Sequence, residues 1–133
     1  MVGETHSTTS GQLYFVSPYH RGHPTVDKCI WTIGVHEEIE TFDVAIQNAW
    51  KADDIAWGVR HYSKNSFSEI GINYGKELLF IAKFVFNQGV WHGYPADVNK
   101  RPNDRPKPNI LSDWISRDII SKPFRSRIQG GKL

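Results

Sequence analysis

The chain has 133 residues, of which 39% are hydrophobic and 13% aromatic. This is typical of one globular domain with its own core and excludes a disordered chain. A single cysteine, Cys29, excludes an intramolecular disulfide. The N-terminus is polar and unlike a signal peptide, and the longest apolar run, Leu78 to Ala82, is too short to span a bilayer. These features predict a cytoplasmic protein with no membrane partner.

The net charge of +2 is unevenly distributed along the chain. Residues 1–93 carry a net charge of −3 and all six histidines, whereas residues 94–133 carry a net charge of +5. A basic C-terminal third indicates an anionic partner such as nucleic acid. The simpler alternative is a solvated surface that complements the acidic part of the same molecule.

The first half of the chain changes from an extended to a helical pattern. Residues 1–11 are expected to form a flexible tail, and residues 12–133 a single α+β domain. Short strands are predicted at 13–16 and at 28–36, where apolar side chains alternate along the chain. Between Thr41 and Lys51 the apolar residues recur at helical spacing, with Thr41 as the predicted N-cap.

Residues 55–94 show the alternation of a four-stranded antiparallel meander, with strands near 55–62, 67–75, 77–86 and 90–94. The third run is apolar on both faces apart from Lys83, which predicts a central, doubly covered strand. A three-residue turn, Asn87 to Gly89, is expected to follow it.

The last third of the chain begins with a proline-rich basic stretch at 99–109, which predicts an extended surface linker. Two short helices are expected after it, one near 109–118 and one that starts from an N-cap at Ser121. The predicted fold class is therefore α+β, with a mostly antiparallel sheet and the C-terminal helices packed on it.

One group of residues points to acid–base chemistry. His92, near the end of the last strand, faces away from Trp91 and titrates near neutral pH, where a general acid or base works. If the strand at 55–62 lies beside the strand at 90–94, Arg60 and Tyr62 would converge with His92, and His20 would join from a loop. This set favours a metal-independent, toxin-like endoribonuclease, in which a guanidinium stabilises the phosphate. The alternative for His92 is a structural hairpin residue.

Other catalytic chemistry has little support in the sequence. The loop that contains His20 and His23 offers two imidazoles, and His36 or Asp27 is the nearest possible third ligand, so metal binding is a third option. A histidine pair in a loop is weak evidence for a metal site, and we expect no metal and no cofactor. Nucleotide-binding, serine-hydrolase and zinc-protease motifs are absent, and a small-molecule substrate is not expected. Cys29 lies on an apolar strand face and is predicted to be a buried side chain.

The candidate binding residues are aromatic side chains of the last strand and basic side chains of the C-terminal third, since the former anchor interfaces and the latter contact phosphates. They are Trp91, Tyr94, Lys100, Arg101, Arg105, Lys107, Arg125 and Arg127. Together with the missing motifs, they favour a small non-enzymatic interaction module with a macromolecular partner, either a protein or RNA or DNA. The alternative is the endoribonuclease that uses His92 and Arg60.

Overall fold

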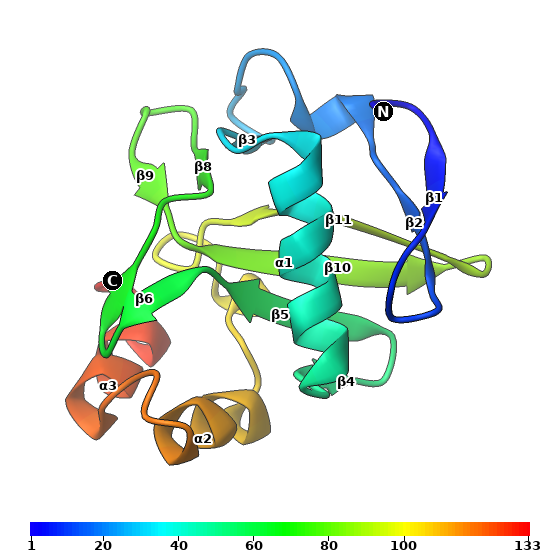
Figure 1. The fold of residues 1–133 in the computed structure, drawn as a ribbon. Helices are drawn as coiled ribbons and strands as arrows, with labels where there is room; N and C mark the ends of the chain where they lie inside the picture. The colour runs from blue at the N-terminus through cyan, green and yellow to red at the C-terminus, as the bar shows by residue number, and fades with distance from the viewer.

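The computed structural model describes residues 1–133 as an α+β fold built on a six-stranded sheet (Figure 1). The strand order is β1-β2-β11-β10-β5-β4, and all neighbours are antiparallel except β2 and β11. The sheet is therefore mixed, although antiparallel pairs dominate it. The strands are β1 (Thr5–Ser7), β2 (Leu13–Phe15), β4 (Lys51–Ala52), β5 (Ile55–Val59), β10 (Ile81–Asn87) and β11 (Val90–Ala96).

The predicted flexible tail is wrong for residues 5–7, because β1 pairs with β2 along its whole length. Hydrogen bonds on either side hold the N-terminal segment in place. The amide of Gly3 donates to the carbonyl of Val16 at 2.7 Å, and the hydroxyl of Thr9 donates to the Asp43 carboxylate at 2.9 Å. The N-terminus therefore forms an edge of the main sheet.

Helix α1 (Val35–Gln47) lies across the middle of the sheet (Figure 1). It starts six residues before the predicted N-cap, and Thr41 lies inside it, where its hydroxyl donates to the carbonyl of Glu37. The predicted strand at 28–36 shrinks accordingly to β3 (Ile30–Trp31). Gly58 of β5 allows the helix to approach closely, because a Cβ at Gly58 would lie 3.0 Å from the carbonyl oxygen of Thr41.

The predicted four-stranded meander is also wrong. After β5 the chain leaves the main sheet and forms a small hairpin of β6 (His61–Ser63) and β7 (Ser66–Phe67). Asn65, with a φ of 61°, makes that turn and bonds to Ser121. A separate three-stranded sheet then joins β3 to β8 (Gly71–Ile72) and β9 (Leu78–Leu79). Of the strands expected in the meander, only those that correspond to β5, β10 and β11 lie side by side in the main sheet as antiparallel neighbours.

Strand β10 is the central strand that the sequence predicts, with β5 on one side and β11 on the other. The turn between β10 and β11 contains two residues rather than three, because Asn87 pairs with Val90. Gln88 and Gly89 both have positive φ, which is typical of the tight turn that matches strand twist.

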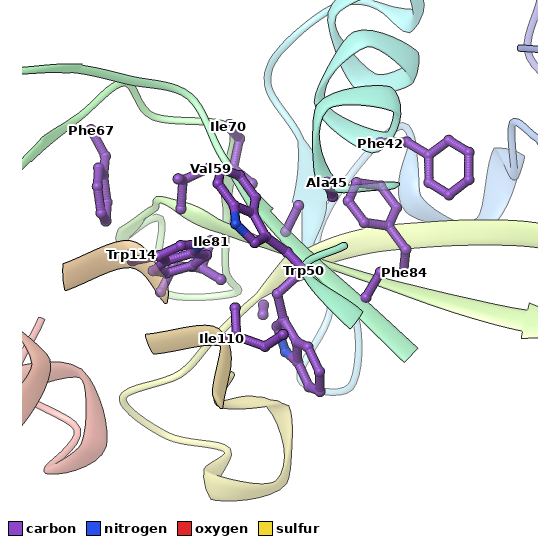
Figure 2. Close-up of a cluster of buried hydrophobic side chains, with 14 of the residues drawn as sticks. Phe42, Ala45, Trp50, Val59, Phe67, Ile70, Ile81, Phe84, Ile110 and Trp114 are labelled. Carbon is purple, nitrogen blue, oxygen red and sulfur yellow. The ribbon is translucent and has the colours of Figure 1, made fainter. Parts of the chain in front are cut away.

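The face of the sheet opposite α1 is covered by η2 (Pro102–Asp104) and α2 (Pro108–Ser116). Helix α3 (Lys122–Gln129) packs on the β6–β7 hairpin, where Phe124 contacts Phe67. Figure 2 shows the side chains of Ile110 and Trp114 from α2 beside Ile81 of β10. The predicted N-cap at Ser121 is confirmed, since its hydroxyl accepts the Phe124 amide at 3.2 Å. No helix is long and apolar enough to cross a lipid bilayer.

Candidate functional site

The largest pocket, about 520 Å³, lies where the loop after β2, strand β11 and η2 meet. We call it the histidine pocket. Only two of its nine lining residues are hydrophobic, so a polar ligand fits it better than an apolar one. The lining residues are His20, Asp27, Cys29, Tyr94, Pro95, Arg101, Pro102, Asn103 and Asp104.

His20 is held in one orientation inside this pocket. Its ring stacks on Tyr94, with centroids 5.2 Å apart, and its Nδ1 lies 3.0 Å from the carbonyl oxygen of Cys29. A carbonyl oxygen only accepts hydrogen bonds, so Nδ1 carries the proton and Nε2 keeps a free lone pair in the neutral ring. Burial lowers the pKa of His20, and the ring is consequently neutral near pH 7.

The loop that carries His20 is fixed to α1 by a buried arginine contact. Arg21 donates to the Glu38 carboxylate and to the carbonyl of Ile33, each at 2.5 Å, and Tyr14 donates to the same carboxylate. Burial raises the pKa of Glu38, although the hydrogen bonds from Tyr14 and Arg21 oppose the shift. This network has no local sequence signature, because its members come from three separate elements.

His92 lies on the same face of β11 as Tyr94, two residues earlier, and therefore about 7 Å along the strand. Its side chain is half-buried, and burial lowers its pKa. It makes no hydrogen bond, and a positive charge on His92 would lower the pKa of His20. The structure thus brings together two of the four predicted catalytic residues, His20 and His92.

A buried ion pair lies beside the histidine pocket, which is lined by one of its two members, Asp104. Lys83, only 9% exposed, lies 3.0 Å from the Asp104 carboxylate, which also accepts the Tyr94 hydroxyl at 2.9 Å. Burial raises the pKa of Tyr94, as does the negative charge of Asp104. Tyr94 therefore stays protonated and positions the His20 ring. Lys83 interrupts an otherwise apolar strand, and that irregularity is the sequence signal that could have identified this pair.

Arg101 separates the histidine pocket from a second hollow of about 330 Å³. Its guanidinium donates to the carbonyl of Val26 at 3.0 Å and forms no ion pair with a carboxylate. We call the second hollow the tyrosine hollow, after Tyr74 in its wall. Cys29 lines both cavities, and burial raises the pKa of its thiol to about 11. At neutral pH Cys29 is thus a thiol and a poor nucleophile.

Arg60 and Tyr62 do not converge with His92. Strand β10 lies between β5 and β11, so the adjacency on which the prediction depends is absent. Arg60 follows the end of β5 and binds α1, with its guanidinium 2.9 Å from Glu40. Helix α1 covers the sheet face opposite to that of His92. Tyr62 is exposed on the β6–β7 hairpin, outside the main sheet.

The eight predicted binding residues fall into four groups. Trp91 is 3% exposed and packs on Phe42 of α1, so it belongs to the core and offers no surface anchor. Arg105 donates to three backbone carbonyls and holds the C-terminal segment in place. Tyr94, Lys100 and Arg101 line the two cavities. The remaining three lie outside the cavities, on or beside α2 and α3: Lys107, Arg125 and Arg127.

The structure brings no three His, Cys, Asp or Glu side chains into an arrangement that would hold a metal ion. Compared with family models, curated proteins and solved structures, the chain matches none of them. Any functional conclusion consequently depends on the chemistry of the two adjoining cavities.

Proposed function

We propose that the protein binds single-stranded RNA through the histidine pocket and the tyrosine hollow. The observation that carries the proposal is the position of Arg101, a guanidinium with no carboxylate partner on the wall between the two cavities. A free guanidinium on a concave polar surface suits a phosphate group, since it can donate two parallel hydrogen bonds.

Exposed aromatic rings flank the same surface. Tyr19 is 57% exposed beside His20, and Tyr74 is 63% exposed in the wall of the tyrosine hollow. Single-stranded RNA is recognised by stacking of its unpaired bases on such rings, combined with basic groups along the backbone. Lys28 lies 5.1 Å from the centre of the Tyr19 ring and Lys100 lines the tyrosine hollow, so cations accompany both tyrosines.

A protein partner has weaker support from these contacts. Interface hot spots are typically large aromatic side chains in apolar surroundings, but Trp91 is in the core and Tyr94 lies in a polar pocket.

The carboxylates that line the histidine pocket differ in how strongly they would repel a phosphate. Asp104 is paired with Lys83, whereas Asp27 is exposed and has no cationic partner. We therefore expect the phosphate to lie nearer Arg101 than Asp27.

We place this RNA-binding module in the cytoplasm. Its one cysteine, Cys29, is free and buried, which fits a reducing compartment. The module needs no cofactor for binding, because the side chains themselves supply the charge and the stacking surfaces.

Fluorescence anisotropy with a labelled single-stranded RNA of about twelve nucleotides tests the proposal. Arg101→Gln should weaken binding about tenfold, equivalent to about 1.4 kcal/mol, whereas Arg101→Lys should retain part of the affinity. Arg127→Gln is the matched control, since Arg127 is an exposed arginine on α3 outside both cavities. Equal losses for Arg101→Gln and Arg127→Gln would show diffuse binding to the basic C-terminal third and refute the proposed site.

A further inference from the structure

We propose that the histidine pocket also cleaves the RNA that it binds, by metal-independent transphosphorylation with His20 and His92 as the acid–base pair. This inference depends on the proposed RNA binding, but it adds a reaction and assigns its groups. It also replaces the predicted partners Arg60 and Tyr62, which lie elsewhere. In their place it uses His20, which lines the pocket, together with His92, which lies two residues from the pocket residue Tyr94 on the same face of β11.

The geometry of the two imidazoles supports the assignment. His20 stacks on Tyr94, and His92 projects from the same face of β11 two residues away. His20 Nδ1 is bound to the carbonyl of Cys29, so Nε2 is the atom that is free to take or give a proton. His92 has no hydrogen-bond partner, and both of its ring nitrogens remain available to a ligand.

The electrostatic coupling between the two rings favours a division of roles. A proton on one imidazole disfavours a proton on the other, as the effect of His92 on His20 shows. Tyr94 of β11, which stacks on His20, stays protonated near neutral pH because burial and the negative charge of Asp104 raise its pKa. Because burial lowers the pKa of both rings, the singly protonated pair, which supplies one base and one acid, forms on the acidic side of neutral pH.

The reaction that such a pair performs on RNA is balanced without a metal or a co-substrate. The neutral imidazole removes the proton of a ribose 2′-hydroxyl, and the 2′-oxygen forms a bond to the adjacent phosphorus. The bond from phosphorus to the 5′-oxygen of the next nucleotide breaks, and the imidazolium protonates that oxygen. The products are a 2′,3′-cyclic phosphate and a 5′-hydroxyl. Arg101 stabilises the charge on the non-bridging oxygens.

The test compares cleavage and binding on the same protein. End-labelled RNA is incubated with the purified protein in EDTA, and the products are resolved on a denaturing gel. A parallel anisotropy titration uses 2′-O-methyl RNA of the same sequence, which lacks the attacking hydroxyl and cannot be cleaved by this route. Circular dichroism reports separately that each variant is folded.

We expect the wild-type protein to yield 2′,3′-cyclic phosphate ends, and His20→Ala and His92→Ala each to lower the cleavage rate by at least 100-fold. His92→Ala should bind 2′-O-methyl RNA with less than a threefold change, since His92 is not among the residues that line the two cavities. His92→Gln, which keeps a polar side chain, serves as a second variant if His92→Ala does not fold. His61→Ala is the matched control, because His61 is exposed on β6 and should leave both readouts unchanged.

Four outcomes would overturn the inference. Binding of both RNAs without cleavage would leave the proposed function in place and exclude the reaction. Cleavage that persists in both histidine variants would show that other groups, or a contaminant, cleave the RNA. Loss of 2′-O-methyl RNA binding in histidine variants that are folded would assign the histidines to RNA binding and not to acid–base catalysis. If the wild-type protein binds neither the unmodified RNA nor the 2′-O-methyl RNA, both the inference and the proposed function are refuted.

Discussion

Replacing Asp43 with Asn should destabilise the fold by loosening the N-terminal edge of the sheet from α1. Asp43 is buried on α1, and its carboxylate accepts bonds from the Thr9 hydroxyl at 2.9 Å, the Ser10 hydroxyl at 2.7 Å and the Ser10 amide at 3.3 Å. Hydrogen bonds to a charged acceptor contribute about 1.5–3 kcal/mol each. Asn keeps one carbonyl oxygen but turns an NH₂ group toward the donors, so we expect a loss of about 2 kcal/mol.

Urea denaturation followed by tryptophan fluorescence measures this loss at pH 7, and thermal unfolding should show a Tm lower by about 7 °C for a domain of this size. Burial alone would raise the pKa of Asp43, but the bonds from Ser10, Thr9 and Thr8 outweigh it and lower the pKa. The stabilisation is therefore complete above the ordinary pKa of aspartate, about 4. It is lost as the pH falls through the lowered pKa of Asp43 in the folded state. The difference in the free energy of unfolding between wild type and Asp43→Asn should therefore become smaller in that pH range.

The matched control for this change is Asp54→Asn. Asp54 is exposed in the turn between β4 and β5, and its side chain accepts no hydrogen bond. Such a surface substitution should change the free energy of unfolding by less than about 0.5 kcal/mol. If Asp43→Asn and Asp54→Asn have equal effects at pH 7, the carboxylate contacts do not stabilise the fold and the reasoning is refuted.

Three further predictions concern binding and packing. If the phosphates contact three basic side chains, the affinity for single-stranded RNA should fall about 20-fold between 50 and 200 mM salt, and a flat salt dependence in anisotropy titrations would contradict the proposed contacts. Gly93→Ala should lower the free energy of unfolding by about 1–3 kcal/mol, since the new methyl group would collide with the buried ring of Phe84. An unchanged midpoint in urea denaturation would show that β11 can shift to accommodate the methyl group. Ser121→Ala should cost about 1 kcal/mol because it removes the N-cap of α3 and a bond from Asn65, whereas Ser116→Ala at the exposed end of α2 should be nearly neutral.

The sequence predicts those elements of the fold whose signals are local. The hydrophobic run of β10 indicates a central strand, the positive-φ glycine at 89 marks the turn after it, and Ser121 marks the start of α3. The alternation along β11 also predicts correctly that Trp91 and Tyr94 face opposite sides of the sheet. In each case the residues that determine the structure lie within one element.

Strand order could not be predicted in the same way, because it depends on contacts between distant segments. The alternation at 67–75 is real, but its residues pair with β3 and β9 instead of with β5. Helix α1 also begins earlier than predicted. In its first turns the carboxylate of Glu38 binds Arg21, and the backbone carbonyl of Glu37 accepts a hydrogen bond from Arg60.

Individual residues of the candidate site could be predicted from the sequence, but their association could not, because it depends on contacts between distant segments. His92 and His20 each appear as titratable side chains next to turn residues, which is a local signal. Their association depends on the loop after β2, which the contact of Arg21 with Glu38 fixes to α1 and which places His20 on Tyr94 of β11. Lys83 is visible in the sequence as a charge within an apolar strand, yet its partner Asp104 lies in the segment predicted to be a linker.

Mapping the RNA-contact residues by photo-crosslinking tests the central claim most directly. A single-stranded RNA that contains 4-thiouridine is irradiated with the protein, and the crosslinked peptides are identified by mass spectrometry. The proposed site predicts crosslinks within residues 19–28, 73–75 and 94–101, the segments that surround the two cavities. Crosslinks confined to α2 and α3, or none above background, would contradict it.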